Sequence, residues 1–320
     1  MGEPTDIQQP GAEQPDAASG TPAAAPAEPG RMPDGATRVA QSRSAALRSR
    51  VRDQRRSPAR PRIWFELALI GISYWLYSLV RNAVPEQEAI AQKHASWIWD
   101  FEHSLGVAFE RSVNHAMDGV GWLITGMNYY YATLHFVVTI GVLVWLYRRH
   151  PGRYVGARTV LFVTTGIALV GFYFFPLAPP RLMTDGGFID TVKTHGTWGS
   201  MASGPATHVS NQFAAMPSMH IGWSMWCGLT LFFLARRTWV RLLGLLYPAA
   251  TLVVIVSTAN HFWMDAVGGL VCLLVGFLTA RWLYHSSVYK LPRVPARETP
   301  EEPITVPEQW SEPAVSTARR

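Results

Sequence analysis

The chain has 320 residues, of which 48% are hydrophobic and 16% are charged, and its formal net charge is +6. Because polar segments at both ends dilute the apolar share, the middle of the chain is apolar enough to indicate a membrane protein. The arginines cluster beside apolar runs and report membrane topology there, so we expect no nucleic-acid partner. The two cysteines, Cys227 and Cys272, lie inside apolar runs and predict no disulfide framework.

Residues 1–62 form a polar N-terminal segment. As far as about residue 37, it is rich in Pro, Ala, Gly, Gln and Glu, which predicts disorder. It has no apolar h-region, so we do not expect a secretory signal peptide. The arginine run from Arg38 to Arg62 is interpreted as a topology anchor beside the first span. Attraction to anionic lipid headgroups is an alternative, and the two roles can coexist.

Six apolar segments follow, each near the roughly 20 residues that a helix needs to cross a bilayer. They are Ile63–Val84, Val120–Tyr147, Thr159–Phe175, Met219–Ala235, Leu242–Ala259 and Ala266–Tyr284. The sequence therefore predicts an all-α, polytopic membrane protein whose six transmembrane helices form one domain, residues 63–285. Residues 286–320, which contain several Pro and Glu, are expected to form a polar C-terminal tail.

The basic residues are unevenly divided between the two sides of this layout. They gather before the first span, after the second, after the fourth and after the sixth. By the positive-inside rule both termini should lie in the cytoplasm, and we expect the protein in the plasma membrane. On the outer side, residues 85–119 should form amphipathic helices at the interface, and the long loop 177–213 should act as a lid.

Two short motifs on the predicted outer side point to phosphate binding. The first, Pro179–Arg181, offers the guanidinium of Arg181, which can donate two hydrogen bonds to the oxygens of a phosphate. The second is Met216–His220. Pro217 suits the opening turn of a helix, and Ser218 would lie among free helix amides, which attract phosphate.

A third motif, Asn260–Asp265, pairs a histidine with a carboxylate. His261 and Asp265 are four residues apart, so on a helix they share a face and the carboxylate can hold the imidazole N–H. We interpret His261 as the nucleophile and His220 as the general acid for the leaving oxygen. The groups expected to bear the phosphoryl charge are the amides that open the fourth span, Arg181 and Ser218.

The order of the three motifs resembles the signature of the type 2 phosphatidic acid phosphatase superfamily of membrane enzymes. The details are similar to its inositolphosphotransferase branch, that of the fungal inositol phosphorylceramide synthase. The matching segments are Phe175–Arg181, Ala215–His220 and Asn260–Asp265, and Asn128–Tyr131 with His135 also resembles this branch. The resemblance implies a six-helix core, a phosphohistidine on His261, and His220 acting first as acid and then as base. It also implies that no metal or other cofactor is needed.

Two cations of the phosphatase members are missing here. No Lys stands shortly before Arg181, and no Ser-Arg pair precedes His261 in the stretch Ile255–Asn260. This sparser pattern resembles the inositolphosphotransferase branch and favours transfer to an alcohol such as inositol. Hydrolysis of a lipid phosphate or a polyprenyl diphosphate is the alternative. Lys193, His195 or His208 in the outer loop could supply the missing charge.

The predicted substrate is a lipid phosphate or phospholipid whose headgroup lies at the interface. The predicted substrate-binding residues are Arg181, Ser218, Asn260, His135 and Tyr131. Asn128, Tyr129, Tyr130, Tyr131 and His135 either line a pocket for the acceptor alcohol or form an aromatic belt at the membrane boundary. Both interpretations stay open.

Two other classes of function compete with the enzyme. In one, His135, His220 and His261 are ligands of a haem in a haem- or quinone-binding membrane subunit. In the other, the protein is a non-catalytic membrane scaffold whose charged groups cap helices.

Overall fold

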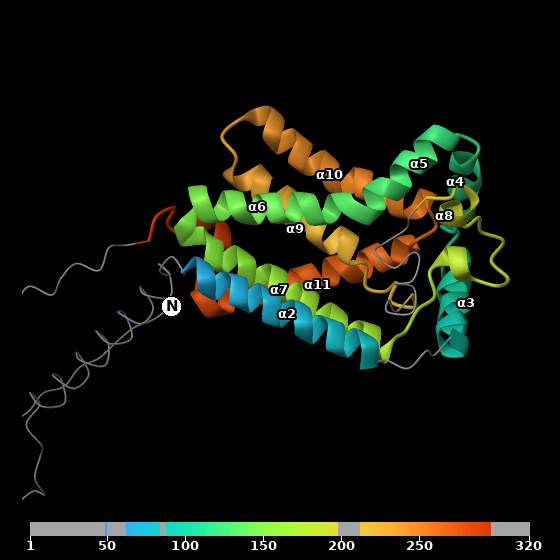
Figure 1. Cartoon of the computed structure of the whole chain (residues 1–320), viewed down its shortest axis with the longest axis horizontal. Helices are drawn as coiled ribbons and strands as arrows, with labels where there is room; N and C mark the ends of the chain where they lie inside the picture. Colours follow the sequence, from blue (N-terminus) through green and yellow to red (C-terminus); the bar gives the residue numbers. More distant parts are fainter. Residues whose placement is uncertain (1–48, 50–61, 84–87, 198–211, 296–320) are drawn as a thin grey trace, which may run out of the picture. The chain divides into compact units, whose positions relative to one another are not determined.

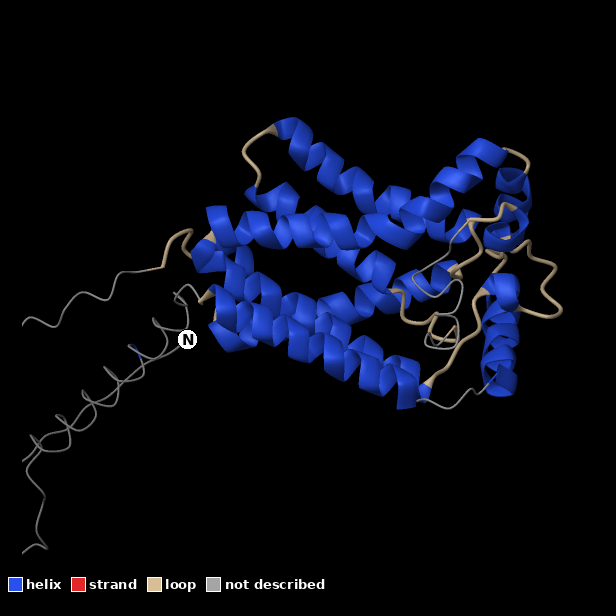
Figure 2. Cartoon of the chain, viewed as in Figure 1, coloured by secondary structure: helices blue, strands red, loops and turns tan. Residues whose placement is uncertain are grey.

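The computed structural model describes Ser49 and residues 62–83, 88–197 and 212–295, which all belong to one compact unit that begins at Ser49. Most of the predicted N-terminal segment, part of the predicted lid and the end of the C-terminal tail lie outside the described residues. Within the described residues the chain is helical, and its only β-pairing is an isolated bridge between Leu177 and Ala214 (Figures 1 and 2). This confirms the all-α fold class.

The helices divide into the apolar ones of the bundle and more polar or shorter ones that connect them. The apolar ones are α2 (Ile63–Ala83), α5 (Gly121–Tyr129) continued by the π-helical turn η1 (Tyr130–Leu134) and α6 (His135–Arg149), α7 (Pro151–Phe174), α9 (Met219–Leu234), α10 (Thr238–Ser257) and α11 (Trp263–Tyr284). The connecting ones are α3 (Glu88–Ser104), α4 (Glu110–Asp118), η2 (Pro180–Leu182), α8 (Thr191–Thr194) and η4 (Val288–Lys290). In Figure 1, α3, α4 and α8 lie at the end of the bundle where α11 begins.

Four of the helical segments are long and apolar enough to cross a membrane, which fits an integral membrane protein. These segments are Gly121–Arg149, Pro151–Phe174, Thr238–Ser257 and Trp263–Tyr284. Two further apolar stretches among the described residues are shorter, namely Ile63–Ser73 within α2 and Met219–Leu234. The structure therefore supports four of the six predicted spans by length and composition.

The third predicted span begins earlier than expected. Helix α7 starts at Pro151 rather than at Thr159, because Pro151 occupies the first helical turn, where its missing N–H costs nothing. The added turns carry Tyr154 and Arg158, whose side chains both hydrogen-bond to the buried carboxylate of Glu66 in α2. These contacts fasten α2 to α7.

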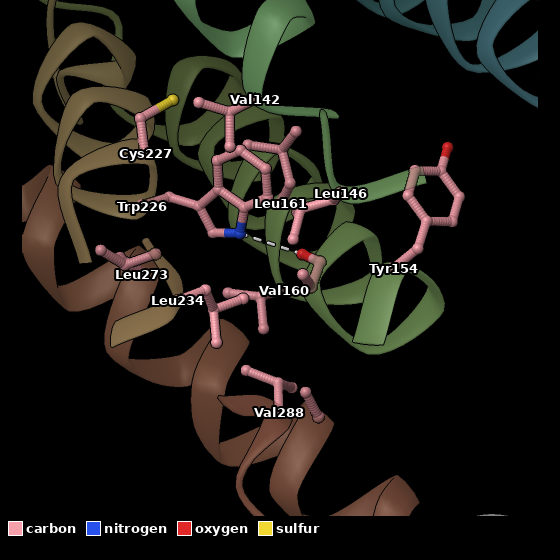
Figure 3. Packing of buried hydrophobic residues seen from close by; sticks show 12 residues of the cluster. Val142, Leu146, Tyr154, Val160, Leu161, Trp226, Cys227, Leu234, Leu273 and Val288 are labelled. Atoms are coloured by element: carbon pink, nitrogen blue, oxygen red, sulfur yellow. Dashed lines mark hydrogen bonds between the residues drawn. The ribbon is translucent and has the colours of Figure 1, made fainter. Parts of the chain in front are cut away.

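The main hydrophobic core lies where α9 packs among α6, α7, α10 and α11. Trp226 of α9 is fully buried there, and its indole N–H donates a 3.0 Å hydrogen bond to the Ala157 carbonyl (Figure 3). Helices α9 and α10 approach so closely that a Cβ at Gly228 would lie 2.3 Å from the carbonyl oxygen of Gly244. Cys227 and Cys272 are both buried free thiols, as the sequence predicted.

Residues 286–295 fall within the predicted polar tail but pack against the start of α7. Val288 and Leu291 are buried, and the Arg153 guanidinium donates to the Leu291 carbonyl at 2.6 Å. The backbone N–H of Gly152 donates to the Arg293 carbonyl at 3.1 Å. The packed helical unit therefore continues past α11.

Candidate active site

The three sequence motifs meet at one end of the long helices. The segment after α7 carries Arg181, the start of α9 carries His220, and the turn before α11 carries His261. The π-helical turn between α5 and α6 adds Tyr131, and His135 follows as the first residue of α6. The structure thus brings together side chains that lie more than a hundred residues apart in the sequence.

His261 and Asp265 form the pair that the sequence predicted, with 3.1 Å between His261 Nδ1 and Asp265 Oδ2. The predicted reason was wrong, because His261 lies outside the helix: α11 begins at Trp263 with Phe262 as its N-cap. The Asp265 side chain instead reaches back over the first turn, where the same Oδ2 also accepts the Phe262 N–H at 3.1 Å. This contact makes Nδ1 the protonated ring nitrogen and leaves Nε2 with its lone pair.

His220 lies next to this pair. Its ring centroid is 5.5 Å from that of His261, and it stacks on Tyr131 at 4.1 Å with 17° between the planes. His220 Nε2 lies 3.2 Å from the carbonyl oxygen of Tyr131, which can only accept, so Nε2 must carry a proton in this contact. The two imidazoles are close enough to act on the same phosphate group.

His135 also packs against His220, with ring centroids 4.2 Å apart. Its Nδ1 also faces the Tyr131 carbonyl, at 3.1 Å. Rings at this separation are in van der Waals contact, so no porphyrin can lie between His135 and His220. The geometry therefore does not support the haem-binding alternative for these two histidines.

The π-helical turn was not predicted. Residues Tyr130–Leu134 interrupt the regular hydrogen-bond pattern of the helix, as π-turns often do at functional sites. The wider turn directs the Tyr131 carbonyl toward His220 and His135. Tyr130 faces α10 instead, where its hydroxyl lies 2.8 Å from Thr251 Oγ1. The aromatic run is thus split between the site and helix packing, and the sequence offers no local signal for the split.

Arg181 is held in place by several contacts. Its backbone N–H donates to the Ala259 carbonyl at 2.8 Å, and its Nε donates to Asn260 Oδ1 at 2.9 Å. Nη1 lies 3.3 Å from the carboxylate of Asp190. Asn260 is fixed in turn by the Thr258 hydroxyl at 2.8 Å. Arg181 and Asn260 are therefore tied to the turn that carries His261, and Asp190 is a partner that sequence reasoning missed.

Ser218 is the N-cap of α9, and its side chain makes no capping hydrogen bond. The hydroxyl is fully buried and has no hydrogen-bond partner among the described residues. Pro217 precedes the N-cap, so it does not occupy the opening helical turn that the sequence suggested. The first amides of α9, which are free at any helix start, are left without the Ser218 oxygen as a cap.

The starts of α9 and α11 are in direct backbone contact. The Ser218 N–H donates to the Asp265 carbonyl at 2.9 Å. A Cβ at Gly269 would lie 2.3 Å from the Ser218 carbonyl oxygen, so only glycine permits this approach. The contact fixes the distance between the His220 helix and the His261–Asp265 pair.

The side chains of the loop residues suggested as substitute cations have other surroundings. His195 pairs with Asp118 at 2.8 Å. Lys193 is exposed on α8, and only its backbone N–H donates to Asp190, the partner of Arg181. His208 lies outside the described residues. Among the residues that the structure describes, no three His, Cys, Asp or Glu side chains are grouped as metal ligands.

The comparisons with known proteins agree with the geometry. A family model described as the PAP2 superfamily matches residues 96–279, which is more than half of the chain and includes Arg181, His220, His261 and Asp265. Comparisons with curated proteins and with solved structures gave no significant match. The match supports phosphatase- or phosphotransferase-type activity in general. The chain belongs to the PAP2 superfamily.

Proposed function

We propose that this protein transfers a phosphoryl or phospho-headgroup from a lipid phosphate or phospholipid through a phosphohistidine on Nε2 of His261. One observation carries the proposal. Asp265 holds Nδ1 of His261, whereas Nε2 is buried without a hydrogen-bond partner among the described residues and the His220 ring stands 5.5 Å away. A nucleophile, the group that orients it and a second imidazole are what a two-step transfer needs.

In the first step, the Nε2 lone pair attacks phosphorus, and the bond from phosphorus to the leaving oxygen breaks. His220 gives its proton to that oxygen, and Asp265 stabilises the cationic ring of the phosphohistidine. In the second step, neutral His220 takes a proton from water or an alcohol, whose oxygen attacks phosphorus and releases His261. Each histidine returns to its starting state, so the cycle balances without a further reactant.

The phosphoryl oxygens would be held by the Arg181 guanidinium, the Ser218 hydroxyl and the first amides of α9. The unpartnered Ser218 hydroxyl and the uncapped helix start support this assignment. Asn260 would act through Arg181, because its side-chain oxygen accepts the Arg181 Nε–H. The proposed transfer needs no metal ion.

Transfer to an alcohol, with inositol as the first candidate, is the preferred reaction. Tyr131 and His135 pack on His220, which is the base that an incoming hydroxyl has to reach. The small number of cations around Arg181 also favours the inositolphosphotransferase branch. Hydrolysis remains the alternative, since water needs only His220. The two reactions share the first step and differ in the second.

We also propose that α2 and α9 complete a six-span arrangement, with both termini in the cytoplasm and the site on the outer face of the plasma membrane. Helix α9 has 16 residues, about 24 Å at 1.5 Å per residue, which is shorter than a bilayer core of about 30 Å. It is packed among longer helices, which would shield its ends from lipid. Cysteine labelling from each side of the membrane tests this orientation.

The proposed chemistry can be tested by trapping the intermediate. Purified protein is incubated with phosphatidic acid or polyprenyl diphosphate carrying ³²P at the terminal phosphate, with and without inositol, and quenched in alkali, which preserves phosphohistidine. We expect label on wild-type protein, none on H261A, and little on H220A. Labelled inositol phosphate would identify a transferase, and free phosphate alone a hydrolase. Turnover without label, or label that survives in H261A, would refute the covalent mechanism.

A further inference from the structure

Two buried carboxyl groups from outside the three motifs cap the helix that follows His261. Glu102 in α3 and Glu110 in α4 are both 0% exposed. Glu110 Oε1 accepts the Trp263 N–H at 3.2 Å, and Glu102 Oε1 accepts the Met264 N–H at 3.1 Å. Asp265 Oδ2 accepts the Phe262 N–H, so the three successive amides of Phe262, Trp263 and Met264 each donate to a carboxyl oxygen.

The two glutamates also contact one another. Their side chains lie close enough to interact, and the Oε2 atom of each is buried without a hydrogen-bond partner among the described residues. Burial, followed by the interaction with Glu110, raises the pKa of Glu102 to about 9. Two neighbouring buried carboxyl groups cannot both ionise easily, so Glu102 keeps its proton at neutral pH and can share it with Glu110.

We propose that Glu102 and Glu110 are positioning residues, which share one proton and fix the start of α11 so that Asp265 stays aligned with His261. This inference rests on the proposed function of His261. Neither glutamate has to touch the substrate, because each acts through the amides of Trp263 and Met264. Asp265 follows those residues directly, so a shift of the first turn would move its carboxylate away from His261 Nδ1.

The shared proton matters because of the charges nearby. The titratable group that interacts with the two glutamates is Asp265, which in turn contacts His261. His103 and Arg111, which follow the two glutamates in sequence, contact Trp99 instead. Without its proton, the pair would carry two charges that repel each other and Asp265 in a buried site. We therefore expect the cap to loosen and turnover to fall as the pH rises through about 9.

The test compares removal of the carboxyl group with its neutral mimic. A glutamine at position 102 keeps an oxygen for the Met264 N–H and donates an N–H to Glu110, as a protonated glutamate does. E102A should lower kcat by about 10-fold or more with KM within about threefold, because a small displacement of a catalytic group is costly. E102Q should restore most of the lost kcat and should lack the decline near pH 9. D100A, an exposed change on the same helix, should match wild type.

Three results would overturn the proposal: wild-type kcat in E102A, equal losses in E102Q and E102A, or an alkaline decline that persists in E102Q. The experiment also includes thermal melting from pH 6 to 10, which does not depend on activity. Wild-type protein should melt at lower temperature as the pH approaches 9, and E102Q should melt at a more constant temperature. If the two proteins differ in this way but no lipid phosphate is turned over, the capping role of the glutamates is supported and the proposed function is refuted. If they do not differ in this way, the shared proton is refuted.

Discussion

Replacing Asp265 by asparagine tests the centre of the site with almost no change in shape. Asp265 is fully buried, and its Oδ2 accepts from both His261 Nδ1 and the Phe262 N–H at 3.1 Å. An amide oxygen at that place keeps both hydrogen bonds as neutral ones but cannot support a cationic phosphohistidine. An amide nitrogen there would instead force His261 into the tautomer with Nε2 protonated.

The magnitude follows from these two effects. A hydrogen bond to a charged group contributes about 1.5–3 kcal/mol and a neutral one about 1 kcal/mol, so the loss of charge alone costs roughly 0.5–2 kcal/mol, or about 2–30-fold in rate. The wrong tautomer multiplies this loss, and the equivalent change in a serine protease triad costs about 10⁴-fold. We expect kcat of D265N to fall by about 10²–10⁴-fold with a small change in KM.

The assay is the initial rate of phosphate release or transfer from a labelled lipid phosphate in detergent micelles. D118N is the matched control, because Asp118 pairs with a histidine of its own, His195, at 2.8 Å. It should keep near wild-type turnover. If D265N retains kcat within about threefold of wild type, His261 needs no carboxylate to orient it, and the mechanism proposed for this site is wrong.

Three further predictions test other parts of the structure. R181A should raise KM and lower kcat by about 10²-fold, as loss of a charge-stabilising donor does, and wild-type kinetics would remove Arg181 from the site. G269A should abolish stable expression or turnover because its Cβ would meet the Ser218 carbonyl at 2.3 Å, whereas G141A, with open space around it, should leave melting temperature equal or higher. Between about pH 5 and 9, the folded chain keeps the Glu102 proton, whereas the unfolded chain releases it. The free energy of unfolding of the wild type should therefore fall by up to about 1.4 kcal/mol for each pH unit that the pH rises, and that of E102Q should fall by less. Chemical denaturation at several pH values measures this difference.

The apolar helices, four of them long enough to span a membrane, and the three motifs were predictable because each depends on local sequence. A run of apolar residues sets a helix of a given length, and the bounds of α11 and α9 agree with the prediction to within a few residues. The meeting of Arg181, His220 and His261 could be inferred only from their predicted placement on one side of the membrane. Their separations depend on backbone contacts such as Gly269 against Ser218, which no single stretch of sequence encodes.

Other features depend on tertiary packing and were missed. The π-turn that directs the Tyr131 carbonyl toward His220 has no sequence mark of its own. Glu102 lies in the segment 85–119 that was predicted to be amphipathic, and it is buried together with Ala91, Ala95 and Ile98. Those residues recur at spacings of three and four, so the stripe that predicts the buried face of α3 already included Glu102. A carboxylate in such a stripe is a signal for a buried partner.

The two helix starts at the site differ in the charge they present, and this difference bears on product release. The amides of Phe262, Trp263 and Met264 at the start of α11 each face a carboxyl oxygen, whereas Ser218 leaves the start of α9 without a side-chain cap. A centre with both starts open would bind the freed phosphate dianion strongly and hold it. With one start open and the other negative, the site would bind free phosphate less strongly than a phosphate ester of lower charge, so in the hydrolytic alternative of the proposed reaction the product would leave more easily.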